Sequence, residues 1–332
     1  MTRKRLFTSD TLDAVAYIVL LLAVASWVAI LCVKQLTYGL EFDESYLLGV
    51  ANNLASGSGY VDDGVTFLST SEPFSPVIST GPTVLIPVSL TWWIFDGDLL
   101  AIRFTMLIFF GILLFSVWRL FGNLSGRWAS LAAVGGLALV PTVAPDLQNT
   151  SLMPGRVVGE LPALALLLLA GLLLSKHRYF WSGLCLGLML LSKLTFAIPA
   201  AALIATFFVF ELLNRHISPW QFLLRNFCGV AAPLIAFELI KTVTLGPDGY
   251  VRHIDALRDF LGNQDIPWHQ LYIFFDEHLE GALRLLSVPL LTVVVVMIAL
   301  TWRWTRLRMG SSQNWRDARD HATGWVIAAL SA

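Results

Sequence analysis

The chain has 332 residues, of which 56% are hydrophobic and 14% are charged, and its mean hydropathy is +0.70. Because a soluble domain carries about 25% charged residues, this composition excludes an ordinary soluble protein and predicts an integral membrane protein. The formal net charge of −1 argues against nucleic acid as a partner, since binding DNA or RNA requires a basic face.

The first long apolar run, at about residues 14–33, follows the basic start of the chain and is long enough to span a bilayer. No small-residue cleavage site follows it, so we expect a retained helix rather than a removed signal peptide. Further spans are expected at about residues 99–121, 128–144, 157–174, 180–191, 195–213, 227–242 and 283–302. The three cysteines, Cys32, Cys185 and Cys228, lie scattered in apolar runs and are interpreted as small core residues.

The distribution of Lys and Arg orients these spans, because cytoplasmic loops are enriched in both. With the N-terminus inside, three outer segments follow, at about residues 34–98, 145–156 and 243–282. The apolar stretch 83–95 within the first is too short to cross, since 13 helical residues cover roughly 20 Å of a core of about 30 Å. With Trp92 and Trp93 at its end, we expect it to lie in the membrane interface.

A last apolar run begins at about residue 323 and contains too few residues to cross a bilayer. It is either a helix half-buried against its neighbours or the start of a span that a longer gene product would complete, and we favour the second interpretation. Residues 1–332 are expected to form one membrane domain without internal repeats. The predicted fold class is an all-α polytopic bundle with interfacial helices in a long first outer loop.

Two adjacent carboxylates, Asp43 and Glu44, follow the first span and open a predicted helix whose apolar residues recur at helical spacing from Leu47. Asp43 is a natural N-cap, and Gly57 and Gly59 are expected to end the helix. Adjacent helical positions point about 100° apart, so the two carboxylates cannot face one substrate atom in the same way. We expect one to act as a base while the other orients a loop or binds a cation. The alternative is that Asp43 only caps the helix.

Five short motifs follow one another in the first two-thirds of the chain: Phe42-Asp43-Glu44-Ser45-Tyr46, Leu54–Tyr60, Gly81-Pro82-Thr83-Val84-Leu85, Gly159-Glu160-Leu161-Pro162-Ala163 and Gly187–Thr195. This ordered set resembles the GT-C superfamily of membrane glycosyltransferases, and is most similar to its protein mannosyltransferase and aminoarabinose transferase branch. The resemblance implies a GT-C-like helix bundle and a polyprenyl-phosphate-linked sugar as donor. It also implies that Asp43, the acidic residue of the first outer loop, is the catalytic base.

The chemistry of the residues agrees with a lipid-carried donor. Nucleotide sugars are absent outside the cytoplasm, and the chain has no Gly-rich phosphate loop on a strand–helix unit. The hydroxyl of a glycan, lipid or protein acceptor needs a carboxylate to take its proton. The departing lipid phosphate needs fixed positive charge, which predicts a basic residue near the outer membrane surface.

Lys193 interrupts two apolar runs on the predicted outer side, and the resemblance implies that it lies near the donor phosphate. The alternative is a snorkelling lysine at a helix end. Many members of these families also carry a Lys before the proline of the first-loop helix, where this chain has Thr80-Gly81-Pro82. That departure puts more weight on Lys193 and on other outer basic residues.

The remaining candidates lie in the other outer segments. Glu160 falls where the resembling families place a second acidic residue, so it is assigned a supporting role together with Glu44. Arg156, four positions earlier, is a further candidate for the donor phosphate, with a simple Arg156–Glu160 ion pair as the alternative. Arg252 and His253 are expected to complete the phosphate site, and a solvated loop is the alternative for them.

No metal or other cofactor is assigned. Asp276-Glu277-His278 lacks the helical spacing of a ligand pair. The acidic residues Asp62, Asp63 and Glu72 are interpreted as a solvated loop, with a divalent cation site as the alternative.

The sequence therefore predicts a glycosyltransferase that moves a sugar from a polyprenyl-phosphate donor to an acceptor hydroxyl at the outer face of the membrane. We expect a bacterial plasma membrane, because no eukaryotic retention signal is visible. A transporter or lipid flippase would require charged residues or broken helices near the bilayer midplane, whereas these spans are apolar except for Glu211 and Glu238 near span ends. A non-catalytic assembly subunit is the third reading, and it predicts that Asp43 and Lys193 lie far apart.

Overall fold

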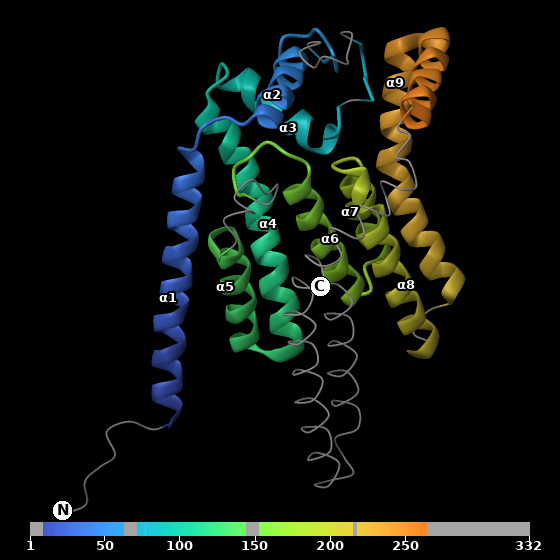
Figure 1. Ribbon diagram of the computed structural model, residues 1–332. Coiled ribbons are helices and arrows are strands. Elements are labelled where there is room, and N and C mark those ends of the chain that lie inside the picture. The colour runs from blue at the N-terminus through green and yellow to red at the C-terminus, as the bar shows by residue number, and fades with distance from the viewer. Residues whose placement is uncertain (1–8, 63–71, 77, 144–152, 215–217, 264–332) are drawn as a thin grey trace, which may run out of the picture. The chain divides into compact units, whose positions relative to one another are not determined.

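The computed structural model describes residues 9–62, 72–76, 78–143, 153–214 and 218–263 (Figure 1). These residues are mostly helical, and within them the only strand-like pairing is an isolated antiparallel bridge between Val61 and Pro73. The helices are α1 (Ser9–Leu36), α2 (Phe42–Ala55), α3 (Pro82–Ile94), α4 (Leu99–Ser125), α5 (Arg127–Val143), α6 (Glu160–Ser175), α7 (Tyr179–Leu190), the short 3₁₀ helix η2 (Leu194–Phe196), α8 (Ala197–Asn214) and α9 (Pro219–Asn263).

Several of these helices suit a membrane. In the described part of the chain, Thr11–Leu36, Leu99–Asn123 and Pro219–Asp259 are long and apolar enough to cross one. The shorter apolar helices α5, α6, α7 and α8 coincide with four further predicted spans. The prediction of an all-α membrane protein is therefore confirmed, whereas the span expected at 283–302 and the terminal apolar run fall outside the described residues.

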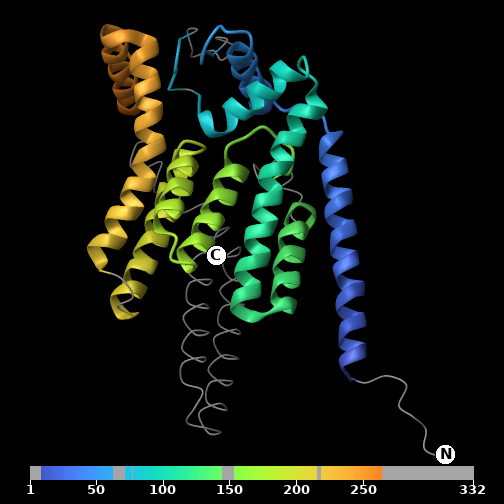
Figure 2. The same ribbon diagram turned by 180° about the vertical axis from the view of Figure 1, so that it is seen from behind.

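The chain divides into two compact units. The first contains Met1–Ala200 and Ile217–Tyr250, and the second contains Ala201–His216 and Val251–Ala332. Within the first unit α4 packs against α5 and α6, and α6 packs against α7. Figures 1 and 2 show α2 and α3 lying across the end of this bundle at which α1 stops and α4 begins. The single domain expected from the sequence stays a prediction.

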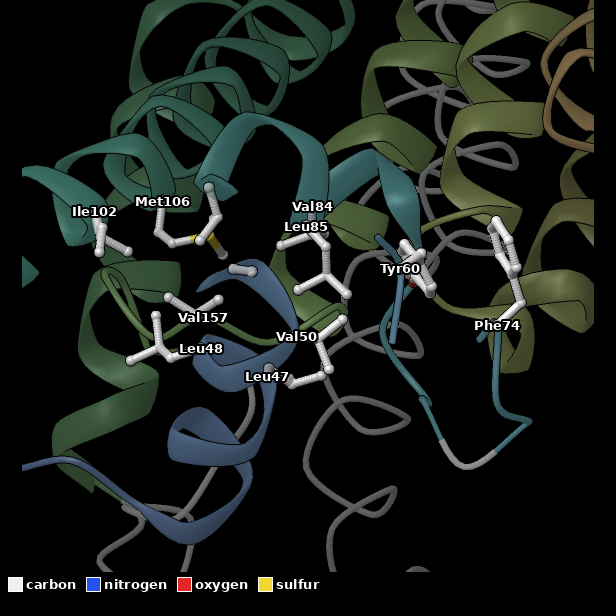
Figure 3. Packing of buried hydrophobic residues seen from close by; sticks show 12 residues of the cluster. Leu47, Leu48, Val50, Tyr60, Phe74, Val84, Leu85, Ile102, Met106 and Val157 are labelled. Carbon is white, nitrogen blue, oxygen red and sulfur yellow. The ribbon is translucent and has the colours of Figure 1, made fainter. Parts of the chain in front are cut away.

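The helices α2 and α3 are held to the bundle by a small apolar core (Figure 3). Buried aliphatic side chains meet there from three helices and one connection. They include Leu47, Leu48, Val50 and Ala51 of α2, Val84, Leu85 and Val88 of α3, Ile102 and Met106 of α4, and Val157 before α6. Each large aliphatic side chain removed from water contributes about 1.5–3 kcal/mol. This core fixes α2, and with it the acidic residues at its start.

The two ends of α2 differ in how well the sequence predicted them. Gly57 and Gly59 follow its last turn with φ of 83° and 97°, a conformation that favours glycine, so the predicted end is confirmed. The predicted N-cap is wrong, because the N-cap is Glu41 and Asp43 already lies in the first turn. No side chain caps this helix, and the Glu41 carboxylate bonds instead to Arg156.

The apolar stretch of the first outer segment forms α3, a helix of 13 residues, as predicted. Gly81 is its N-cap and Pro82 opens it, where the missing N–H of proline costs nothing. One side of the helix packs into the core, while Ile86, Leu90 and Trp93 are exposed. This exposed apolar side suits a helix that meets lipid, and its place in the interface stays a prediction.

The segment expected as a third outer loop, from about residue 243, is helical as far as Asn263, and its place on the outer side of the membrane stays a prediction. Gly246 interrupts α9 with φ 68° and ψ 170°, and Pro247 restarts the helix after it. A Gly-Pro pair kinks a helix because proline lacks an N–H and glycine accepts the left-handed conformation. The Glu238 carboxylate bridges this kink, since it accepts a hydrogen bond of 2.8 Å from the hydroxyl of Tyr250.

Candidate active site

Three acidic side chains surround the start of α2, and the helix geometry sends them in different directions. Glu41 precedes the helix in an extended conformation, while Asp43 and Glu44 occupy its first turn. Because neighbouring helical positions point about 100° apart, Glu44 is buried and Asp43 is exposed. The three carboxylates therefore have three different environments.

Glu44 forms a buried ion pair with Arg103, a residue of α4. Nε of Arg103 lies 3.2 Å from Oε1 of Glu44, and Nη2 lies 2.9 Å from Oε2, so the contact is bidentate. The other guanidinium N–H groups donate to backbone carbonyls at the end of α1 and just after it, those of Gln35, Leu36, Tyr38 and Gly39. One buried guanidinium thus joins α1, α2 and α4 and satisfies carbonyls that the end of α1 leaves open.

Glu41 is held by a second arginine, Arg156, from the connection that precedes α6. Both terminal nitrogens of Arg156 donate to the Glu41 carboxylate, and the guanidinium also lies over the Tyr38 ring, 5.6 Å from its centroid. The side chain of Arg156 is almost completely buried, whereas that of Glu41 is about one-third exposed. This pair attaches the connection before α6 to the start of α2.

Asp43 differs from both neighbours because no arginine engages it. Its side chain is exposed, and no donor within the described residues forms a hydrogen bond or an ion pair with it. Of the three carboxylates, Asp43 is therefore the one whose oxygens are open to a ligand.

Lys193 lies directly after α7, as N-cap of η2, with its backbone extended. Its Nζ is 3.0 Å from Oε1 of Glu160 and 3.4 Å from Oγ of Ser79. The Lys193 and Glu160 side chains remain 18% and 25% exposed, so this ion pair is reachable from outside the fold. Oε2 of Glu160 is itself buried, and none of the described residues donates a hydrogen bond to it.

The alternative of an ion pair between Arg156 and Glu160 on one helix face is not what the structure shows. The helix α6 begins only at Glu160, so Arg156 lies before it in the connection. Arg156 bonds to Glu41 instead, and Glu160 bonds to Lys193. Two interactions between distant segments replace one local interaction.

Arg252 and His253 lie on the part of α9 that follows Gly246 and belong to the second compact unit. Arg252 is exposed and His253 is half-buried. The residues described so far in the site all belong to the first unit, so the role of Arg252 and His253 at a donor phosphate stays a prediction.

The acidic residues of the first outer segment do not form a solvated loop throughout. Asp62 is completely buried and accepts a hydrogen bond of 3.4 Å from the Tyr46 hydroxyl, while Glu72 is exposed and Asp63 falls outside the described residues. In the ranges that the structure describes, no group of three or more His, Cys, Asp or Glu side chains is arranged to hold a metal ion.

Arg103 is the residue of this region that the sequence reasoning missed. The signal was present, since an arginine stands four positions after the start of a long apolar helix. A charged side chain inside a membrane helix is normally paired with an opposite charge or with backbone carbonyls. Its partner, Glu44, was assigned a supporting role beside Asp43 without any partner of its own, so the pair was not recognised.

A second missed feature is an aromatic group that attaches the first outer segment to α9. The rings of Tyr60 and Phe74 stack with centroids 5.3 Å apart, and Phe237 of α9 contacts both edge-on at 6.0 Å and 5.9 Å. The Tyr60 hydroxyl donates to the carbonyl of Thr80, 3.1 Å away. This aromatic group thus holds in place the residues that lead to Gly81, and these include Ser79, which contacts the Lys193 ammonium.

Comparison with known proteins supports the resemblance. Residues 80–237 match the sequence model of the family described as dolichyl-phosphate-mannose-protein mannosyltransferase. The matched segment contains Arg103, Arg156, Glu160 and Lys193, and it begins after Asp43. No curated protein and no solved structure matches the chain significantly. The matched segment and the apolar helices that could span a membrane support a membrane glycosyltransferase of the GT-C type.

Proposed function

We propose that the protein transfers a sugar from a polyprenyl-phosphate donor to an acceptor hydroxyl at the outer face of a bacterial plasma membrane. Asp43 is the catalytic base, Lys193 binds the donor phosphate, and Glu44 and Glu160 shape the site around them. The acceptor is the hydroxyl of a glycan, a lipid or a protein.

The observation that carries this proposal is the contrast between Asp43 and the carboxylates on either side of it. Glu41 and Glu44 are engaged by Arg156 and Arg103, which hold the start of α2 in place. Asp43 is exposed and makes no ion pair with any described residue. A general base must be open to the proton that it accepts and held by a rigid support, and Asp43 meets both requirements.

In the proposed reaction, the Asp43 carboxylate takes the proton of the acceptor hydroxyl as the hydroxyl oxygen attacks the anomeric carbon. A new glycosidic C–O bond forms, and the bond between the anomeric carbon and the phosphate oxygen breaks. The leaving group is the polyprenyl phosphate, which keeps the electron pair of the broken bond. Negative charge therefore develops on the phosphate, where a fixed cation stabilises the transition state more than the ground state.

Lys193 is the cation proposed for that charge. Its ammonium is held by Glu160 and lies near the Ser79 hydroxyl, and the pair retains some exposure. An arriving phosphate can therefore contact Lys193 without opening the fold. Arg156, Arg252 and His253 are proposed as further donor-phosphate residues, with Arg156 the one that contacts the start of α2.

The donor class can be tested with the purified protein in nanodiscs, supplied with one sugar in two forms. One form is linked to polyprenyl phosphate and the other is a nucleotide sugar, and transfer to a mixture of acceptor glycans, lipids and peptides is followed by mass spectrometry. We expect transfer from the polyprenyl-phosphate sugar only. Transfer from the nucleotide sugar alone would contradict the proposed donor.

A further inference from the structure

The Lys193 ammonium is positioned by a turn, residues 191–193, that two other segments approach unusually closely. At Gly81, a Cβ atom would lie 1.8 Å from the carbonyl oxygen of Leu191. At Gly159, it would lie 2.5 Å from the carbonyl oxygen of Ser192 and 3.3 Å from Cδ of Lys193. Real Cβ contacts do not occur below about 3 Å, so any side chain at either position would displace the turn.

Neither glycine is required by its backbone conformation. Gly81 has φ −92° and ψ −175°, and Gly159 has φ −78° and ψ −21°, both open to any residue. Only the proximity of the turn excludes a side chain at these two places. Glycine is therefore needed at both positions because the segments approach each other closely, and not because of its backbone angles.

Polar contacts join the same three segments. The N–H of Gly81 donates to the Ser192 carbonyl at 3.0 Å, and the buried Ser192 hydroxyl donates to the Gly159 carbonyl at 2.7 Å. The Thr83 hydroxyl donates to the Leu188 carbonyl at 2.8 Å, which attaches the first turn of α3 to the last turn of α7. The turn is thus held on two sides, next to the residue that carries the ammonium.

This arrangement sets where the ammonium lies. The segment that contains Gly81 supplies Ser79, and the segment that contains Gly159 supplies Glu160. Both side chains contact Nζ of Lys193. A shift of the turn would therefore separate Lys193 from both of its contacts.

We propose that Gly81, Gly159 and Ser192 are positioning residues that hold the Lys193 ammonium where a lipid phosphate binds. This inference rests on the proposed function, in which Lys193 binds the donor phosphate. It adds that the affinity for the phosphate depends on three residues that do not contact it. The rival explanation is that these residues only stabilise the packing of α3, α6 and α7.

A double-mutant experiment separates the two explanations. Binding of polyprenyl monophosphate, without sugar, is measured in nanodiscs for the wild type, Ser192→Ala, Lys193→Ala and the double variant. The Ser192→Ala change removes one hydroxyl without adding bulk, and Gly159→Ala provides an independent displacement of the turn. Gly111→Ala is the matched control, because a Cβ at Gly111 meets nothing within 4 Å.

We expect Ser192→Ala and Gly159→Ala each to weaken binding about tenfold, while Gly111→Ala binds as the wild type does. In the Lys193→Ala background, Ser192→Ala should cause no further loss, because the residue that it positions is gone. Equal losses in both backgrounds, or wild-type binding by Ser192→Ala, would overturn the positioning role alone. Wild-type binding by Lys193→Ala would instead overturn the phosphate role of Lys193 in the proposed function, and this inference with it.

Discussion

Arg103 of α4 and Glu44 of α2 lie 59 positions apart in the sequence and form a bidentate ion pair with side chains only 2% and 1% exposed. The same guanidinium binds carbonyls at the end of α1. A buried pair of this kind is costly to break, because the remaining charge keeps its desolvation penalty without compensation. The pair therefore acts as a structural support directly beside Asp43.

Replacing Arg103 should reveal that support. Arg103→Met leaves Glu44 buried without its partner and several carbonyls without a donor, so we expect a loss of about 3–5 kcal/mol in the free energy of unfolding. The measurement is chemical unfolding of the purified protein in detergent. The control is Arg127→Met, whose ion pair with Asp13 is about half exposed and should contribute about 0–1 kcal/mol. Similar losses in the two variants would contradict a special role for Arg103.

Two substitutions distinguish a structural role of Arg156, as partner of Glu41, from a role in binding the donor phosphate. Glu41→Gln removes the charge that engages Arg156 and leaves the guanidinium itself in place. We expect this variant to leave the donor KM unchanged or lower, whereas Arg156→Gln should raise the donor KM by about tenfold, because a cation near the leaving phosphate is lost. Steady-state kinetics at varied donor concentration provide the measurement. An unchanged donor KM in Arg156→Gln would remove this residue from the donor site and leave it a structural partner of Glu41.

Local sequence patterns predicted a helix well where its apolar residues recur on one face or where the whole segment is apolar. The span at 14–33 lies within α1, the stretch 83–95 forms α3, and the helix that ends at Gly57 is α2. The span expected at 227–242 stops before Gly246 and Pro247, whereas the helix α9 continues past the kink at Gly246 as far as Asn263. Gly and Pro interrupt a helix in either case, and only packing decides whether it resumes.

The site was less predictable, because its charges pair across segments that are distant in the sequence. Spacing suggested the local pair Arg156–Glu160, but the chain path brings Glu41 to the first residue and Lys193 to the second. Arg103 was missed for the same reason, since no local pattern connects it with Glu44. Short-range geometry did predict that the two adjacent carboxylates would diverge, and they do.

Because of Tyr60, the free energy of unfolding is expected to depend on pH in the alkaline range. Burial raises the pKa of its phenol above the usual value of 10, and Tyr46 adds to the shift. The unfolded chain loses this proton near pH 10 while the folded protein retains it, so the stabilisation is complete below about pH 10 and is lost as the pH rises further. Tyr60→Phe cannot show this loss. At pH 8 it should be less stable by about 1 kcal/mol, because the Thr80 carbonyl loses its donor.

Thermal unfolding between pH 8 and 11 provides the measurement for Tyr60. The difference in stability between the wild type and Tyr60→Phe should shrink above pH 10 as the wild type loses its advantage. A difference that stays constant across this range would show that Tyr60 titrates normally.

Replacing Glu160 should change the KM values of the substrates more than it changes the stability of the fold. Its ion pair with Lys193 is partly exposed, so Glu160→Gln is expected to cost no more than about 1 kcal/mol of stability. If the carboxylate orients the acceptor, the acceptor KM rises severalfold while the donor KM does not rise, because one negative charge near the phosphate is removed. Kinetics with each substrate varied in turn test this. A rise in the donor KM alone would contradict the supporting role and indicate that Glu160 serves mainly to hold Lys193.

The central claim is that Asp43 is the catalytic base, and single-turnover sugar transfer by Asp43→Asn tests it most directly. The matched control is Asp96→Asn, which also exchanges an exposed carboxylate for an amide, in the connection between α3 and α4. We predict that Asp43→Asn slows transfer by at least about 100-fold while it binds polyprenyl monophosphate as the wild type does, and that Asp96→Asn remains active. Transfer by Asp43→Asn at the rate of the wild type would contradict the account.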